Sequence, residues 1–333
     1  MQPINGISKT DLIALAGLFL VALSAYGQNA FLSQVVALML IAFVGLALAT
    51  GDWIIVLFSS YAATWFAWIY SSASAGAIPI EAGTQALETL ALITAGLVLY
   101  FIVRKGTTPT DTYKDAICVL ALFFAILGLM RWGFFDGHPA ATLGNRNFLA
   151  AFLAVSAPCF YRRRWWLGLP IIIGCLIACH TATAIAAFVI SAGWFLWGWR
   201  GALLAAVPGA LYFSVFKAPQ TFFYRLDYWT DSISKLSNSW HQILFGVGPG
   251  VLWQSGNMLH SEYVYTLWYF GLFGLGIAAL YTFRSFRTIG DRAIFASFLA
   301  ILIDGAGNHI MHTAPTAYLA IVIMALKDRT LEA

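Results

Sequence analysis

The residue types and spacing best suited to chemistry lie in Phe245–Gly274. A glycine-rich turn there leads to His260 and Glu262, and an apolar run of helical length follows directly. We expect His260 at the N-terminal end of that helix, where the helix dipole disfavours imidazolium and leaves the ring able to accept a proton. Glu262 could orient the ring or bind a hydroxyl group. A histidine that only anchors the helix end at the level of the lipid headgroups is the alternative.

Two arginines have the side chain that best holds a phosphate group, because a planar guanidinium can donate two parallel hydrogen bonds. Arg225 lies in the same polar region as His260, and Arg146 is flanked by Asn145 and Asn147 just before an apolar run. We assign both arginines to anion binding. For each, a salt bridge with a nearby acid or a contact with lipid headgroups is the alternative. Arg131 is a weaker candidate for the same task.

The last polar run, DGAGNHIMHTAP, contains Asp304, His309 and His312. The two histidines are three residues apart and could form a metal pair, but a metal site needs three or four ligands and the run supplies no further pattern. We therefore expect no metal and no other cofactor. The glycines of Gly246–Gly250 predict a tight turn, and their N–H groups could also approach an anion closely.

These side chains must be positioned by a lipid-embedded scaffold. Of 333 residues, 61% are apolar and 10% are charged, whereas soluble domains carry about 25% charged residues. Long unbroken apolar runs exclude a transmembrane barrel, whose strands alternate apolar and polar positions. The first apolar run has no small-residue cleavage site, so we interpret it as a first span rather than a signal peptide. We expect an all-α polytopic membrane protein with a single transmembrane domain over residues 1–333.

Twelve apolar runs predict transmembrane helices, near 11–26, 31–49, 53–70, 87–103, 116–130, 147–160, 166–179, 182–198, 201–216, 261–283, 291–303 and 314–326. With a cytoplasmic N-terminus, the inner side receives 13 of the 18 Lys and Arg residues. This positive-inside asymmetry places both termini in the cytoplasm. Trp165–Phe216 could instead hold two long spans. That alternative would move five basic residues to the outer side, against the positive-inside rule, so we expect three short spans there. Because the basic clusters set the topology, the net charge of +4 does not indicate a nucleic-acid partner.

This topology places all six histidines on the outer side or at an outer span end: His138, His180, His241, His260, His309 and His312. Any chemistry is therefore expected on the outer face. The largest outer loop, 217–260, carries part of the site. Its middle, Thr221–Trp240, predicts an amphipathic surface helix with Arg225 and Trp229 on one face. Its apolar positions are Phe222, Phe223, Leu226, Trp229, Ile233 and Leu236.

Four segments in combination resemble the bacterial O-antigen polymerase and O-antigen ligase superfamily, which includes the pilin-type O-oligosaccharyltransferases. They are Arg225-x3-Trp229, Leu244–Gly250, His260–Tyr263 and Phe270–Gly274. Support comes from Gly144–Ala150 and Asn308–Pro315, so that the resemblance covers roughly residues 131–326. One departure concerns Cys179–Ala184, where the family commonly has a Ser-Arg-Gly-type element and this chain has no arginine. Arg146, Arg131 or His180 could take the place of that arginine.

The resemblance implies a multi-pass glycosyltransferase of the bacterial inner membrane. Its donor would be an oligosaccharide on undecaprenyl pyrophosphate, presented at the periplasmic face, with the lipid tail in a groove between spans. His260 would act as the base, Arg225 and Arg146 would bind the pyrophosphate, and Glu262, Arg131, His309, His312 and His180 would support them. A chain-length regulator protein is an implied partner. The products of a polymerase, a ligase and a protein O-oligosaccharyltransferase differ only in the acceptor, which the sequence does not decide.

A transporter or flippase is the alternative of another class, because it fits twelve spans with both termini inside. Transporters place ionisable or helix-breaking residues near the membrane midplane and contain repeated halves. The sequence shows neither feature, since its polar residues gather on one face. We therefore favour the enzyme, and most specifically a polymerase.

Overall fold

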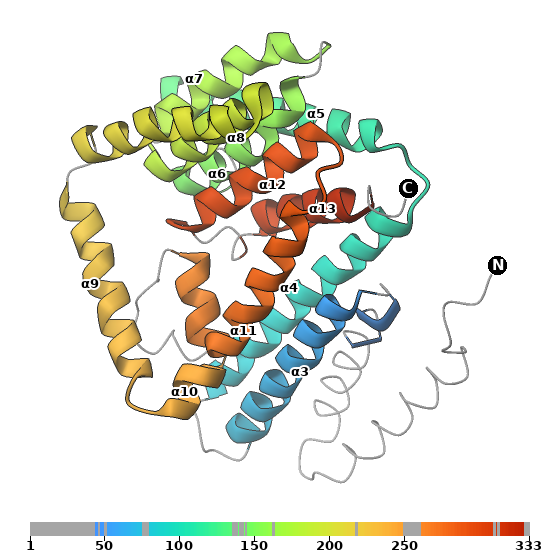
Figure 1. The fold of residues 1–333 in the computed structure, drawn as a ribbon, viewed down its shortest axis with the longest axis vertical. Helices are drawn as coiled ribbons and strands as arrows, with labels where there is room; N and C mark the ends of the chain where they lie inside the picture. The colour runs from blue at the N-terminus through green and yellow to red at the C-terminus, as the bar shows by residue number, and fades with distance from the viewer. Residues whose placement is uncertain are drawn as a thin grey trace. The chain divides into compact units, whose positions relative to one another are not determined.

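The computed structural model describes residues 44–45, 47–49, 52–74, 80–134, 139, 143, 145–161, 164–216, 219–248, 261–308, 311 and 314–329. Within these residues the regular structure is helical (Figure 1), as the sequence predicts. The predicted span 11–26 and most of the predicted span 31–49 lie outside the described residues. The predicted single domain divides by its internal contacts into two units. Unit 1 comprises Met1–Phe101, Lys235–Met258 and Thr266–Phe283, and unit 2 comprises Ile102–Ser234, Leu259–Tyr265 and Arg284–Ala333.

By length and composition, three described helical segments could cross a membrane: Thr110–Phe134, Ala182–Val207 and Glu262–Phe286. The last two each contain a break in the helix, described below. Trp53–Ile69 and Trp166–Cys179 are shorter apolar stretches. The chain therefore has the transmembrane helical character that its composition predicts.

Unit 1 contains α3 (Trp53–Ser74), most of α4 (Ile80–Lys105), α10 (Trp240–Phe245) and the greater part of α11 (Glu262–Phe286). Because α3 continues to residue 74 and α4 begins at residue 80, the connection between them is shorter than the predicted loop 71–86. The ring of Phe270 in α11 packs against Phe58 and Tyr61 of α3, with ring centroids 5.4 and 6.1 Å apart.

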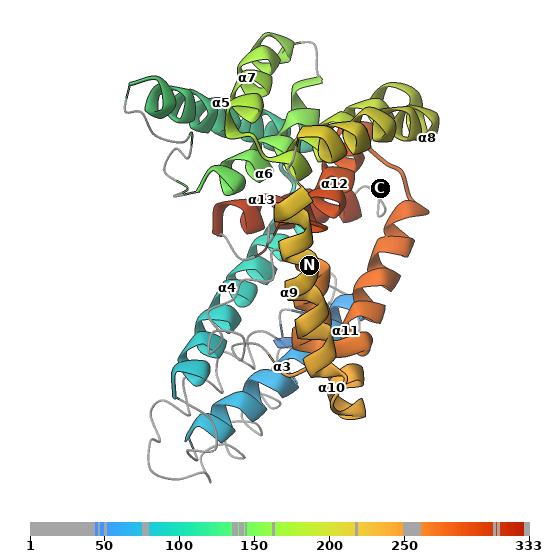
Figure 2. The same cartoon turned by 90° about the vertical axis from the view of Figure 1, so that its left-hand side faces the viewer.

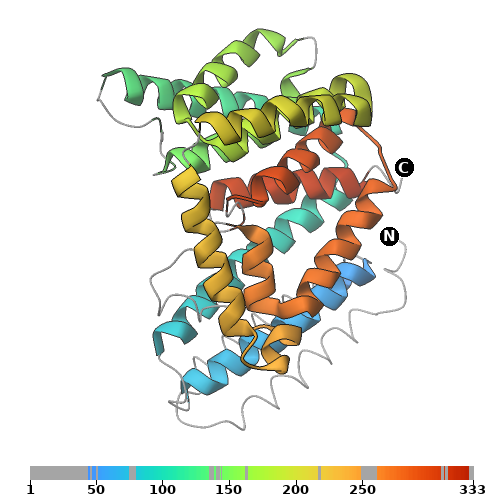
Figure 3. The same cartoon turned by 60° about the vertical axis from the view of Figure 1, so that its left-hand side comes forward.

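Helix α11 is not continuous, although the sequence predicts one uninterrupted span here. Gly271 has a left-handed φ of 64° and divides the helix into two arms, which meet at an angle in Figure 3. The backbone at Gly271 packs directly on the carbonyl group of Leu244, so that a side chain at this position would collide with it. A tertiary contact therefore sets the position of the break.

Unit 2 contains the remaining helices: α5 (Thr110–Phe134), α6 (Arg146–Ser156), α7 (Leu169–Cys179), α8 (Ala182–Phe216), α9 (Pro219–Leu236, of which residues up to 234 belong here), α12 (Arg292–Gly305) and α13 (Ala314–Arg329). Two short 3-10 helices, η1 (Ala157–Tyr161) and η2 (Trp166–Gly168), connect α6 to α7. Helix α12 packs against α8, α6 and α13, and α5 packs against α6 and α7 (Figures 1 and 2).

Helix α8 folds back on itself. Its backbone is non-helical at Trp197 and Gly198, and the backbone at Gly201 lies directly against the carbonyl group of Gly193. In a continuous helix these two glycines would be about 12 Å apart. The chain therefore reverses close to the boundary between the predicted spans 182–198 and 201–216, and each arm is shorter than the about 20 residues that a straight span needs.

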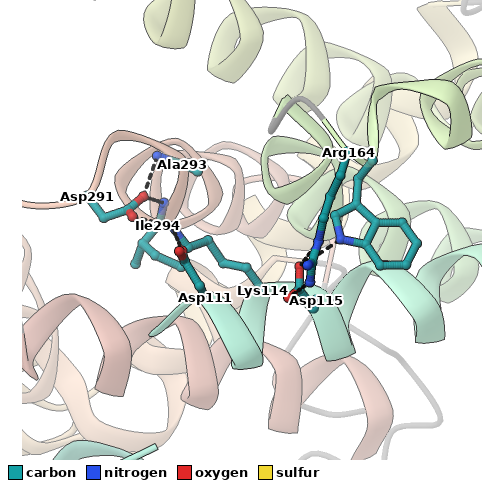
Figure 4. Close-up of polar contacts among 8 residues, drawn as sticks. Asp111, Lys114, Asp115, Arg164, Asp291, Ala293 and Ile294 are labelled. Carbon is teal, nitrogen blue, oxygen red and sulfur yellow. Dashed lines mark hydrogen bonds and ion pairs between the residues drawn. The ribbon is translucent and has the colours of Figure 1, made fainter. Parts of the chain in front are cut away.

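Ion pairs between side chains join the N-terminal ends of α5 and α12 (Figure 4). Lys114 is buried and forms ion pairs with Asp111, at 3.0 Å, and with Asp291. Asp291 also caps α12 by accepting hydrogen bonds from the N–H groups of Ala293 and Ile294. The next residue of α5, Asp115, pairs with Arg164 and accepts a hydrogen bond from the indole of Trp165 at 2.7 Å.

Candidate functional site

The candidate site is built around a tight turn that ends α12, residues 304–308, which we call the α12 turn. The N–H groups of Gly307 and Asn308 both donate to the carbonyl oxygen of Asp304, at 3.0 and 2.9 Å. Asp304 is completely buried and Asn308 is 4% exposed. All of its contacts described below lie within unit 2.

The side chain of Asn308 holds the turn against α8. Its amide nitrogen donates to the Asp304 carboxylate at 2.8 Å and to the hydroxyl of Thr183 at 2.9 Å. A buried carboxylate needs such donors, because water cannot reach it. Thr183 lies in the first turn of α8, so this hydrogen-bond network joins the end of α12 to the start of α8.

Arg225 reaches the α12 turn from α9. Its guanidinium Nη1 donates to the carbonyl oxygen of Gly307 at 2.6 Å. The side chain is half-buried. Burial lowers the pKa of Arg225, and the charge of Asp304 opposes that shift. An arginine stays protonated near neutral pH even so, and its further N–H donors can serve a bound anion.

One face of α9 is turned toward the rest of unit 2. Arg225, Trp229 and Ser232 follow one another at helical spacing and are buried or half-buried. Leu226 and Ile233, which the sequence places on the apolar face, are 41% and 45% exposed. The predicted pairing of Arg225 and Trp229 on one face is confirmed.

Glu262 reaches the same region from the start of α11. Ser261 caps this helix, and its hydroxyl accepts a hydrogen bond from the N–H of Val264 at 3.5 Å. The Glu262 N–H donates to the carbonyl oxygen of Asn308 at 3.2 Å, and its carboxylate accepts from the N–H of Met311 at 2.6 Å. The predicted helix start after His260 is thereby confirmed.

Gly307 lies where two site residues approach the turn. A Cβ atom at this position would collide with the methyl group of Thr183 and lie 3.6 Å from Nη1 of Arg225. At Gly305, by contrast, a Cβ atom would make only ordinary contact with Glu262, at 3.5 Å. The close approach of α8 therefore requires glycine at 307 and not at 305.

A second polar group lies at the start of α6. Asn145 caps this helix by accepting from the N–H of Asn147 at 2.8 Å. The Asn147 side chain in turn accepts from the hydroxyl of Thr181 at 3.0 Å. Arg146, the first residue of α6, is close enough to Cys179 for electrostatic interaction. The predicted anion-binding Arg146 therefore lies beside the turn between α7 and α8.

The remaining predicted site residues are placed as follows. His180 ends α7 with a left-handed φ of 52° and is exposed, between the predicted spans 166–179 and 182–198. Arg131 is exposed in the last turn of α5. His260, His309 and His312 lie outside the described residues, so their predicted roles stay predictions.

The glycine-rich turn has a structural task. The N–H groups of Gly246, Val247 and Gly248 donate to Gln242, Trp268 and Tyr269, at 2.8, 2.8 and 3.0 Å. These donors are used and cannot also bind an anion. The prediction of a tight turn is confirmed for this part of Gly246–Gly250, and the additional anion-binding role is wrong for these three N–H groups.

Sequence reasoning chose Arg225 and Glu262, which the structure brings to one turn, but gave no role to Thr183, Gly307 and Asn308. It named Asp304 without assigning it a function. The sequence pattern that could have indicated these residues is DGAGN, in which an acid and an amide directly follow an apolar run. A polar side chain at such a position needs a hydrogen-bond partner.

No protein-family model matches the chain, and no curated protein matches it either. The family resemblance therefore stays a prediction that rests on the residues quoted for it.

Proposed function

We propose that this chain is a membrane glycosyltransferase of the O-antigen polymerase kind. It would move glycan from an undecaprenyl-pyrophosphate donor to a glycan acceptor at the periplasmic face of the bacterial inner membrane. One observation carries the proposal: Arg225 and Glu262, from distant parts of the sequence, both hydrogen-bond to residues 307–311, at 2.6 Å each. An arginine and a carboxylate that are held by the same segment at the end of a span could bind a phosphorylated donor and a hydroxyl acceptor.

Contacts between residues that are predicted to lie on the same side of the membrane support the proposed topology, which has twelve spans and both termini in the cytoplasm. Residues assigned to the inner side contact one another: Lys114 with Asp291, Asp115 with Arg164, and Arg284 with Asp328. Residues assigned to the outer side also contact one another: Asn147 with Thr181, Asn308 with Thr183, and Arg225 with Gly307. An error of one span between these segments would have paired inner with outer residues.

In the proposed reaction, the acceptor hydroxyl oxygen attacks the anomeric carbon of the donor glycan. That carbon–oxygen bond forms while the bond from the anomeric carbon to the pyrophosphate oxygen breaks, which inverts the configuration. His260 takes the hydroxyl proton, and Arg225, with Arg146, stabilises the charge that develops on the leaving undecaprenyl pyrophosphate. Fixed arginines can supply this stabilisation, so we propose a reaction that needs no metal or other cofactor.

The acceptor distinguishes the closely related activities. A polymerase would extend the next lipid-linked repeat, in company with a chain-length regulator, whereas a ligase or a protein O-oligosaccharyltransferase would use another acceptor. Purified chain in lipid nanodiscs, given lipid-linked repeats and lipid A core with a chelator present, should lengthen the lipid-linked chains. Glycan transferred only to lipid A core would assign a ligase instead.

The Arg225→Lys variant tests the anion-binding role. Lysine keeps the charge but loses the planar fork, so we expect transfer to fall by roughly 100-fold. Asp227→Asn is the matched control, because Asp227 is exposed on the same helix. Full activity of Arg225→Lys, or equal loss in both variants, would remove Arg225 from the mechanism.

Glu262→Gln separates the structural task of this residue from a catalytic one. Glutamine can still accept the hydrogen bond from Met311, so the variant should fold normally. We expect transfer to fall by roughly 10-fold or more. The neutral amide cannot orient a charged partner, and it accepts hydrogen bonds at one oxygen where the carboxylate accepts them at two. Normal transfer by a folded variant would leave Glu262 with the structural task alone.

The break in α11 favours a second candidate, a transporter or flippase, because broken helices commonly form transport sites. In such sites the unwound carbonyl groups bind the ion. Here the carbonyl oxygens of Trp268, Tyr269 and Phe270 accept hydrogen bonds from Val247, Gly248 and Tyr61. Since those oxygens are engaged, we rank transport second. Uptake of a lipid-linked glycan by proteoliposomes, without a covalent product, would reverse the ranking.

A further inference from the structure

Asn308 joins three helices at one point. Its side chain donates to Thr183 at the start of α8 and to Asp304 at the end of α12, at 2.9 and 2.8 Å. Its carbonyl oxygen accepts from the N–H of Glu262, the first residue of α11, at 3.2 Å. Both side-chain bonds come from one amide nitrogen, so the orientation of this buried side chain is fixed.

The peptide group that precedes Asn308 carries the acceptor for Arg225. This group contains the carbonyl of Gly307, which binds Nη1, and the N–H of Asn308, which donates to the Asp304 carbonyl oxygen at 2.9 Å. Fixing Asn308 therefore fixes the direction in which the Gly307 carbonyl points. The following peptide group, through the Asn308 carbonyl, fixes the start of α11.

We infer that Asn308 is a positioning residue that sets Arg225 and Glu262 relative to each other through the peptide groups on its two sides. The part it plays in glycan transfer rests on the proposed function. Asn308 itself touches neither substrate and acts only through the two residues that it places. This role explains why a buried amide connects three separate helices beside the candidate site.

The amide is suited to this task because it donates two hydrogen bonds to two different acceptors. Aspartate in its place would lose both donors and set a second carboxylate beside Asp304. Alanine would remove the donor that Asn308 supplies to both Thr183 and Asp304, and would leave Asp304 with the side-chain hydrogen bond of Thr183. Thr183→Val and Thr183→Ser form a matched pair, because valine lacks the hydroxyl that accepts from Asn308 whereas serine keeps it.

The direct test measures the placement of Arg225 and needs no enzymatic activity. The full chain in nanodiscs is treated with phenylglyoxal, which modifies accessible arginines, and the rate at Arg225 is followed by peptide mass spectrometry. We expect Asn308→Ala to raise that rate severalfold, because the half-buried guanidinium loses its fixed acceptor. The exposed Arg287 is the internal reference, and its rate should not change. An unchanged rate at Arg225 overturns the inference.

Kinetics of glycan transfer give the second measurement. Displacement of a catalytic group by about 1 Å can lower a rate by roughly 100-fold, so Asn308→Ala should lower kcat by that order. On an Arg225→Ala background the same change should lower kcat much less, because only the part of its effect that acts through Glu262 remains. Equal losses in both backgrounds would mean a general structural role and would also overturn the inference.

Thr183→Val replaces Asn308→Ala if the latter does not fold. Faster modification of Arg225 in Thr183→Val, but not in Thr183→Ser, supports positioning, and equal rates in both overturn it. These measurements also separate this inference from the proposed function. If the wild-type chain transfers no glycan but Asn308→Ala exposes Arg225, the positioning role stands and the proposed function fails.

Discussion

The hydroxyl group of Tyr61 donates a hydrogen bond to the carbonyl oxygen of Phe270, 3.0 Å away, directly before the residue at which α11 stops being helical. The same hydroxyl lies 2.7 Å from the carbonyl oxygen of Phe245. With the N–H groups of Val247 and Gly248, it satisfies the carbonyl oxygens at the end of the first arm. The surrounding residues therefore stabilise the break, since the carbonyl groups at a helix end in an apolar environment need hydrogen-bond donors.

Replacement of Gly271 by alanine tests whether the fold depends on this break. Alanine would have to adopt a left-handed φ and would collide with the Leu244 carbonyl, so we expect a loss of at least about 2–3 kcal/mol of folding free energy. Gly276 is the control, because it lies in the same helix with open space around its Cα. Gly276→Ala should change stability by no more than about 1 kcal/mol.

Both variants would be measured by unfolding titration in mixed micelles. Equal stability of Gly271→Ala and Gly276→Ala would mean that the break is not required by the fold.

The helix starts could be predicted from the sequence because a cap depends on adjacent residues. Ser261 and Asn145 have side chains that cap well, and each begins a helix as expected. Asp291 does the same for α12. Local chemistry is sufficient at these positions.

The break at Gly271 could not be predicted in the same way. Its cause is the carbonyl of Leu244, which lies in another helix. The apolar composition of the run gives no indication of it, since glycine is common in membrane helices. The face of α9 that turns inward was also set by a remote partner, the Gly307 carbonyl that binds Arg225.

The candidate site was predictable only in part for the same physical reason. Arg225 and Glu262 carry charges, so they are conspicuous in an apolar chain. Thr183 and Asn308 are ordinary polar residues, whose importance arises from the hydrogen bond between them. No spacing rule relates two residues that meet only through tertiary structure.

Cysteine labelling checks the proposed topology. The four native cysteines are buried, so single cysteines introduced at exposed positions can be followed. Asp227→Cys on α9 should react with a membrane-impermeant maleimide in intact cells, because this loop is proposed to face the periplasm. Ile289→Cys, in the exposed connection between α11 and α12, should react only after the cells are opened. Labelling of both positions in intact cells would contradict the proposed number of spans.

A substitution of Lys114 tests the ion pairs that this residue forms with Asp111 and Asp291 (Figure 4). Lys114→Met would leave Asp291 without its buried cation, and we expect a loss of about 2–3 kcal/mol, less than for a fully buried pair because Asp291 is partly exposed. Adding Asp291→Asn should restore much of the stability, because asparagine keeps the cap of α12 without the charge. The measurement is the same unfolding titration. A double variant no more stable than Lys114→Met would argue against the ion pair as the cause.

The contact between Gly307 and Thr183 allows the α12 turn to be tested by a pair of compensating changes. Gly307→Ala should lower glycan transfer by roughly 10- to 100-fold, because its methyl group would collide with that of Thr183 and displace the carbonyl that binds Arg225. Thr183→Ser should cause little loss alone, since serine keeps the hydroxyl that accepts from Asn308.

The combination of both changes should recover most of the activity, because serine lacks the methyl group that the alanine would meet. Gly305→Ala is the control in the same turn, where the added Cβ would lie 3.5 Å from the nearest side-chain atom of Glu262 and should be accommodated. A double variant as impaired as Gly307→Ala would show that the close packing of α8 on the turn is not what holds Arg225 in place.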